Sequence, residues 1–186
     1  AVYGKNKKAL ILDLDNTLWE GVIGDDGPEG IEIGEETSLG QAYREFQSYI
    51  KMHKDIGILL AINSKNDLEN AVSGLTHPDG LLRPEDFQVI KANWNNKDAN
   101  IREIAQELNL GADSFVFVDD NIVERDIVKK GTQGVAVPEI VTVESYITTI
   151  DKAGYFEIIE LSKEDIVRNQ MYKVNVERKT AQKEFF

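Results

Sequence analysis

Two acidic residues stand at the end of a short apolar run near the start of this 186-residue chain. The run Ala9–Leu12 has the length and composition of a buried strand, and Asp13 and Asp15 follow it closely. In extended backbone, residues two apart point to the same face, so these carboxylates lie side by side. Like charges so close repel each other and are costly to bury, which favours a bound cation or a raised pKa on one carboxyl. The stretch therefore predicts a catalytic or metal-binding site at a strand end.

Apolar runs of this kind alternate with helical patterns along most of the chain. Further strands are predicted at 58–62, 87–90, 115–118 and 135–137, and helices at 38–56, 67–75, 98–108 and 122–130. Because the strands are continuous apolar runs, we expect a parallel sheet covered on both faces and connected by right-handed crossovers. The fold class is therefore α/β, with a doubly wound, Rossmann-like sheet.

Two segments fall outside this alternation. Residues 20–34 carry five glycines and a proline between short apolar pairs, which predicts a small β-flap after the first strand. No interval between the predicted elements is long enough for an inserted domain, so one catalytic core is expected to span 1–155. Residues 156–186 are predicted to form a helical tail that leads to, or docks on, another domain of the same polypeptide.

Composition narrows the classes of function. The net charge of −12, from 33 acidic and 21 basic residues, argues against a nucleic-acid partner, because binding to that backbone needs Lys and Arg. No apolar run approaches the roughly 20 residues that span a bilayer, so no membrane partner is expected. The chain has no cysteine, which excludes disulfides and a thiol nucleophile. We expect a cytoplasmic enzyme.

Polar residues after three of the predicted strands are expected to converge. In an open parallel sheet, the carboxyl ends of the strands lie at one edge, where ligands bind. The residues that would meet there are Asp13, Asp15, Ser64, Lys97, Asp119 and Asp120. Carboxylate oxygens suit a hard cation such as Mg²⁺, whereas a hydroxyl, an ammonium and backbone N–H groups suit phosphate oxygens.

These residues resemble the four motifs of haloacid dehalogenase superfamily phosphatases. The stretch Asp13-Leu14-Asp15-Asn16-Thr17 is similar to motif I, Ser64 to motif II, Lys97 to motif III and Asp119-Asp120 to the acidic motif IV. Longer matches at 13–24, 64–67 and 118–121, the last followed by Glu124 and Arg125, resemble the FkbH-like branch of the superfamily. The resemblance covers nearly the whole chain.

The resemblance implies a Mg²⁺-dependent phosphatase that works through an aspartyl-phosphate intermediate. Asp13 would be the nucleophile and Asp15 the general acid and base, with Lys97 stabilising charge on the phosphoryl group. The metal would be held by Asp13, by Asp15 through its backbone carbonyl, and by Asp119 or Asp120; substrate contacts would come from Thr17, Ser64, Lys65 and Asn66. Members of the superfamily often insert a cap domain between motifs I and II or between II and III, and no such interval here is long enough for one. The phosphorylated substrate of an uncapped site is expected to be large or carrier-bound, or another domain is expected to cover the site.

Two other functions remain open. FkbH-like proteins load a phosphorylated three-carbon acid onto an acyl carrier protein, so a glyceryl or phosphoryl transferase is the first alternative. Glyceryl-loading members carry a cysteine just before the motif II serine, whereas this chain has Asn63, which favours hydrolysis. The second alternative is a non-enzymatic, receiver-like phospho-switch; receivers place the acidic pair first and the phosphorylated Asp in mid-chain, which reverses the order found here.

Overall fold

A four-stranded parallel sheet in the order β3-β2-β1-β4 forms the centre of the molecule. The computed structural model describes residues 7–156, so the predicted helical tail lies outside the described residues, apart from Phe156. The strands are β1 (Ala9–Leu12), β2 (Leu59–Ser64), β3 (Val89–Ala92) and β4 (Phe115–Val118). The helices are α1 (Ile23–Gly30), α2 (Ser38–Asp55), α3 (Leu68–Leu75), α4 (Lys97–Leu108), α5 (Ile122–Gly131) and α6 (Val143–Ala153), with 3₁₀ turns η2 (Pro84–Asp86) and η3 (Ala112–Ser114).

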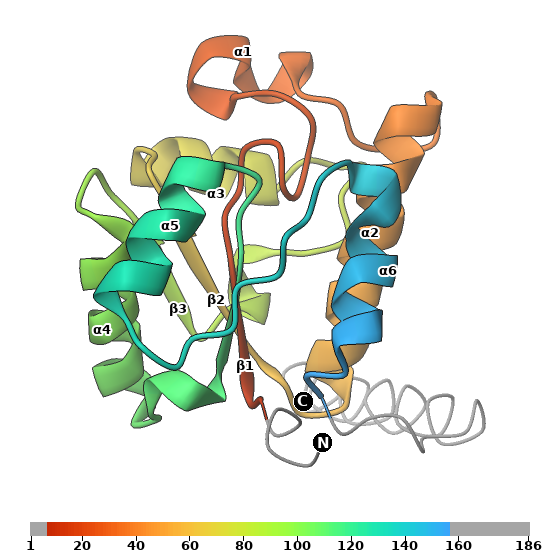
Figure 1. Cartoon of the computed structure of the whole chain (residues 1–186). Coiled ribbons are helices and arrows are strands. Elements are labelled where there is room, and N and C mark those ends of the chain that lie inside the picture. The colour runs from red at the N-terminus through yellow and green to blue at the C-terminus, as the bar shows by residue number, and fades with distance from the viewer. Residues whose placement is uncertain (1–6, 157–186) are drawn as a thin grey trace, which may run out of the picture.

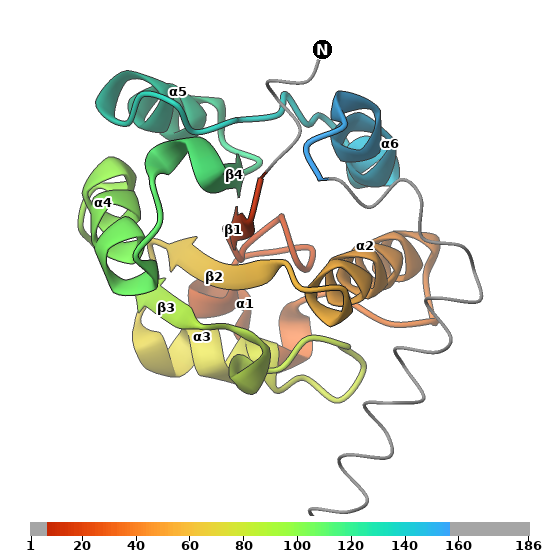
Figure 2. The ribbon, with the colours of Figure 1, turned by 90° about the horizontal axis from the view of Figure 1, so that it is seen from below.

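Helices cover both faces of the sheet, as predicted. Helices α4 and α5 lie on one side, and α2, α3 and α6 lie on the other (Figures 1 and 2). Alternate residues of β1 divide between these layers, since Leu10 and Leu12 join the core beneath α2 while Ala9 and Ile11 join the core beneath α4. All four are fully buried, which explains why the strand is a continuous apolar run.

The longest helix shows how local sequence sets these layers. Tyr43, Phe46 and Ile50 recur at helical spacing along α2, and all three are buried against the sheet. Thr37 caps the helix, because its hydroxyl oxygen accepts a hydrogen bond of 2.9 Å from the Gly40 N–H. The chain then turns at Gly57, whose φ of +107° favours glycine.

The expected β-flap over 20–34 is wrong in its secondary structure. Residues 23–30 form the short helix α1, two turns joined at Gly27, where φ is +69°. The hairpin survives only as one antiparallel bridge between Glu20 and Glu32 at the base of the segment. Helix α1 lies over the carboxyl ends of the strands (Figure 1).

Two other expectations need correction. The strand predicted at 135–137 makes only a single parallel bridge, between Ala136 and Val116. Helix α6 was not predicted, although Val143, Tyr146 and Ile150 form its buried stripe. Within the described chain no further domain stands between the strands. None of the helices within 7–156 is both long and apolar enough to cross a bilayer.

We predict that Gly74→Ala destabilises the protein. Gly74 is buried on α3 against the indole ring of Trp19, and a methyl group there would overlap that ring. Repacking should lower the free energy of unfolding by about 1–3 kcal/mol in urea titrations. Ser73→Ala, one residue earlier on the same helix, is the matched control and should change it by less than about 0.5 kcal/mol. Equal stability of the two variants would contradict this packing.

Candidate active site

A buried lysine joins the acidic residues at the ends of two adjacent strands. Lys97 is the first residue of α4 and is only 3% exposed. Its Nζ lies 3.1 Å from an oxygen of Asp13, after β1, and 2.5 Å from an oxygen of Asp119, after β4. Because β1 and β4 pair in register, with Leu12 opposite Val118, residues 106 positions apart are brought to one point at the sheet edge.

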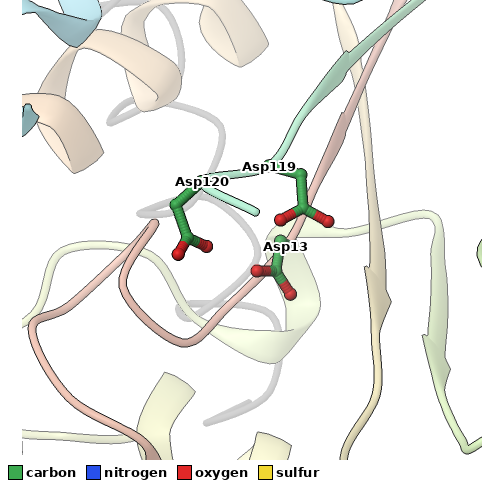
Figure 3. Close-up of side chains that lie close together, drawn as sticks. All are labelled: Asp13, Asp119 and Asp120. Carbon is green, nitrogen blue, oxygen red and sulfur yellow. The ribbon is translucent and has the colours of Figure 1, made fainter. Parts of the chain in front are cut away.

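Three carboxylates face one another at this point, and two of them pair with the lysine. Oxygens of Asp13, Asp119 and Asp120 lie within 4.8 Å of one another, and their side chains converge in Figure 3. Within this cluster one ammonium stands against three carboxylates, which leaves two negative charges that a divalent cation would balance. All the donor atoms are oxygens, so the cluster fits a hard ion such as Mg²⁺.

Burial makes the cluster costly to ionise fully. Burial, together with the nearby Asp120 charge, raises the pKa of Asp13 to about 6. The Lys97 ammonium lowers this pKa, but by less. Burial and the Asp13 charge likewise raise the pKa of Asp119 to about 7. Lys97 is also desolvated, but the two carboxylates beside it raise its pKa and keep it an ammonium. Raised carboxyl pKa values without enough neighbouring cations are typical of a site that takes a metal.

The Asp15 carboxylate is not a member of the acidic cluster and accepts hydrogen bonds from three donors. One of its oxygens accepts hydrogen bonds from Trp19 Nε1 (3.1 Å) and the Ile23 N–H (2.9 Å), and the other from Asn66 Nδ2 (3.0 Å). The buried indole and the start of α1 therefore fix this carboxylate beside Asp13. Its side chain is not part of the carboxylate cluster, so a metal contact through its backbone carbonyl stays a prediction.

The loop between these aspartates and Thr17 is clamped by two tyrosines. Asn16 adopts a left-handed conformation, with φ of +58°, and its carbonyl accepts hydrogen bonds from the hydroxyls of Tyr43 (3.3 Å) and Tyr146 (2.8 Å). These tyrosines come from α2 and α6, on the same face of the sheet. The packing of two helices thus holds the left-handed turn that directly follows the two acidic residues.

Three of the predicted substrate-binding residues are not among those that line the pocket described below. Thr17 is fully buried and donates to an Asp120 oxygen at 3.1 Å. Ser64 and Asn66 are also buried, and Asn66 Nδ2 donates to the Ser64 hydroxyl oxygen at 2.9 Å as well as to Asp15. Their hydrogen bonds orient the acidic residues, and their contact with a substrate stays a prediction.

Lys65, the fourth of these residues, lies at the pocket wall. Its ammonium is 3.0 Å from an oxygen of Glu124, in the first turn of α5. The neighbouring Arg125 is buried and donates to the backbone carbonyls of Asp119 (3.0 Å) and Ile140 (3.3 Å). Sequence reasoning missed both roles because each partner lies in another segment of the chain.

These groups line a pocket of about 210 Å³ at the carboxyl edge of the sheet. Its lining residues are Asp13, Asp15, Asn16, Val22, Lys65, Lys97, Asp119, Asp120, Asn121 and Glu124. The volume is below the roughly 300–1,000 Å³ of pockets that enclose a drug-sized ligand. A phosphoryl group and the atoms next to it therefore match its size better than a whole large molecule.

Asn63 has a structural task beneath this pocket. Its side chain is fully buried; Nδ2 donates to the Lys97 carbonyl (2.9 Å), and Oδ1 accepts from Asn100 Nδ2 (3.0 Å). Both ends of the amide therefore tie β2 to the first turn of α4, which begins with the lysine of the site. In the sequence, Asn63 stood out only because glyceryl-loading FkbH-like proteins carry a cysteine at the matching position.

In comparisons with solved structures, the chain has the α/β fold that haloacid dehalogenase proteins share. It is similar to a deoxy-D-mannose-octulosonate 8-phosphate phosphatase from Haemophilus influenzae, solved with cobalt (TM-score 0.53, 16% identity, covering 87% of this chain and 97% of that one). It is also similar to a haloacid dehalogenase family enzyme from Bacteroides thetaiotaomicron, solved with magnesium (TM-score 0.54, 10% identity, 78% and 99%).

A more similar structure is the N-terminal part of protein BF1531 from Bacteroides fragilis, which contains a phosphatase domain and was solved with Mg. The two share 44% identity with a TM-score of 0.81 over 85% of this chain. The chain spans less than half of that structure, 43% of its length. No family model and no curated protein matches the sequence.

We predict that Asn63→Ala weakens both the fold and the placement of Lys97. The change leaves the Lys97 carbonyl and the Asn100 amide without their buried partner, which should lower the free energy of unfolding by about 1–3 kcal/mol in urea titrations. Asn95→Ala is the matched control, because Asn95 is exposed. A variant as stable as the control would show that these hydrogen bonds do not contribute to the free energy of unfolding.

Proposed function

We propose that this chain is a Mg²⁺-dependent phosphatase that hydrolyses a phosphate ester through an aspartyl-phosphate intermediate. The observation that carries this proposal is the cluster of three carboxylates, two of them paired with a buried ammonium, with the hydrogen-bonded carboxylate of Asp15 nearby in the chain. The 44% identity to the N-terminal part of BF1531, which contains a phosphatase domain and was solved with Mg, supports this proposal. Location in the cytoplasm and the lack of a nucleic-acid partner stay predictions.

The proposed reaction uses the two aspartates in unequal roles. An oxygen of Asp13 attacks phosphorus, the bond to the leaving oxygen breaks, and Asp15 gives that oxygen a proton. Asp15 then takes a proton from water, whose oxygen attacks the phosphorus of the aspartyl-phosphate and releases phosphate and free Asp13. The Lys97 ammonium, held beside Asp13, stabilises negative charge on the phosphoryl oxygens.

The acidic cluster would hold the metal through Asp13, Asp119 and Asp120, with Asp15 contributing its backbone carbonyl. Bound Mg²⁺ would supply positive charge between the nucleophilic carboxylate and the anionic phosphoryl group. Thr17 orients Asp120, and the backbone N–H of Asn121 donates to Asp119 at 2.9 Å.

The alternatives have less support. We infer an FkbH-like branch from the motif matches, but thioester transfer to an acyl carrier protein would need an accessible nucleophile before Ser64. Asn63 occupies that position and is buried with both amide ends engaged. A receiver-like switch would have β1 between β2 and β3, whereas here β1 lies between β2 and β4.

We predict opposite kinetic signatures for the two aspartates. Asp13→Asn removes the nucleophile and should lower phosphate release from p-nitrophenyl phosphate by roughly a thousandfold or more. Asp15→Asn keeps the nucleophile but loses the proton donor and base, so phospho-enzyme should accumulate, detected by intact-protein mass spectrometry after acid quench. Each assay is run once with Mg²⁺ and once with EDTA, which removes the metal.

The matched control is Asp113→Asn, an exposed aspartate at the opposite end of β4. It should behave like the wild-type protein in both assays. Phosphate release that persists in Asp13→Asn would rule out the covalent mechanism, and unchanged turnover in Asp15→Asn would remove that residue from acid and base catalysis.

We also predict that Mg²⁺ binding weakens as the pH falls. With folded pKa values of about 6 and about 7, Asp13 and Asp119 take up protons below neutrality, and those protons compete with the metal. Both pKa values are raised above those of the unfolded chain, so the metal-free fold loses stability as the pH rises from about 4 to about 7. Mg²⁺ should therefore raise Tm more at pH 8 than at pH 5.5, and not at all in Asp119→Asn. An equal rise in the wild-type protein at both pH values would contradict this.

A further inference from the structure

One carboxylate oxygen of a pocket-lining residue is buried and has no hydrogen-bond partner. Within residues 7–156, Oε2 of Glu124 is the only buried side-chain nitrogen or oxygen in this condition. Glu124 is 9% exposed and lines the pocket that holds the acidic cluster. A buried acceptor left unpaired costs about 1–3 kcal/mol, which favours a ligand that brings a donor to it.

The other oxygen of the same carboxylate is already engaged. Oε1 lies 3.0 Å from the ammonium of Lys65, whose side chain is partly exposed at 36% and also lines the pocket. An ammonium carries three N–H donors. Both residues line the same small pocket, so a ligand there would meet an ammonium paired with a carboxylate.

A hydroxyl is the group that satisfies both at once, because it accepts from an ammonium while donating to a carboxylate. A carboxylate on the ligand would meet the Glu124 charge and the acidic cluster. An ammonium on the ligand would meet the Lys65 charge. The pocket volume of about 210 Å³ limits this group to atoms next to the phosphoryl group.

We propose that Lys65 and Glu124 form a subsite that recognises a hydroxyl on the carbon next to the ester carbon of the substrate. This inference rests on the proposed phosphatase function and deepens it: the substrate class is a phosphate ester of a polyhydroxy compound. Glu124 is the specificity-determining residue, and Lys65 is the donor that it orients.

The test compares esters that differ in one group: ethyl phosphate, 2-hydroxyethyl phosphate, 2-aminoethyl phosphate and carboxymethyl phosphate. The wild-type protein should prefer 2-hydroxyethyl phosphate over ethyl phosphate by about 10- to 100-fold in kcat/KM, and over both charged esters. In Glu124→Ala the ratio of the first two esters should fall toward one. Asp126→Ala is the matched control, because Asp126 pairs with Lys130 on the exposed side of the same helix; it should keep the wild-type ratio.

Calorimetric titration with Mg²⁺ alone separates this role from a role in metal binding. Mg²⁺ affinity in Glu124→Ala within about threefold of the wild-type value supports the subsite, whereas a larger loss would overturn it by assigning Glu124 to the metal. Equal wild-type turnover of ethyl and 2-hydroxyethyl phosphate, or an unchanged ratio in Glu124→Ala, would also overturn it while leaving the phosphatase function intact. Failure to hydrolyse any of the four esters would count against both proposals.

Discussion

The shared ammonium of Lys97 is the interaction on which this site depends. It neutralises one charge of a cluster that would otherwise place three carboxylates at the edge of a buried sheet. Breaking a buried pair by removing one partner leaves the other charge uncompensated, and such losses reach about 3–5 kcal/mol. The parallel register of β1 and β4, the start of α4 and the acidic loop are therefore mutually dependent. The residual charge of this assembly gives a physical reason for a divalent cation.

Much of the fold was predictable because its strongest signals are local. Local patterns are enough to recognise the apolar runs of β1, β2 and β4 and the apolar stripes of α2 and α4. The parallel order of the strands then predicts that the polar residues after them lie at one edge of the sheet. Segment 20–34 was misread because its glycines and proline weaken any helical pattern. Helix α1 contacts α3 and begins with an N–H that binds Asp15, and such tertiary contacts are invisible to local pattern reasoning. The stripe of α6 was readable and was overlooked.

The site was predicted at the level of residue types but not of partners. Asp13, Lys97 and Asp119 do meet, since topology alone brings them together. The partners of Glu124 and Arg125 could not be predicted, because adjacent residues of opposite charge suggest a local ion pair. In the structure each side chain instead reaches a different segment. Thr17 and Ser64 show a related limit: their positions match a motif, while their hydrogen bonds lead to other protein side chains.

The buried guanidinium of Arg125 has a consequence for how the protein opens. It bonds the carbonyls of Asp119 and Ile140, so the acidic loop and the segment leading to α6 are fastened to one cation. Moving either piece outward takes a carbonyl partner away from a buried charge, which makes partial detachment unfavourable. Through Tyr146, α6 also reaches the Asn16 carbonyl. Backbone amides in these three separate stretches should therefore exchange with solvent deuterium as one cooperative unit rather than in sequence.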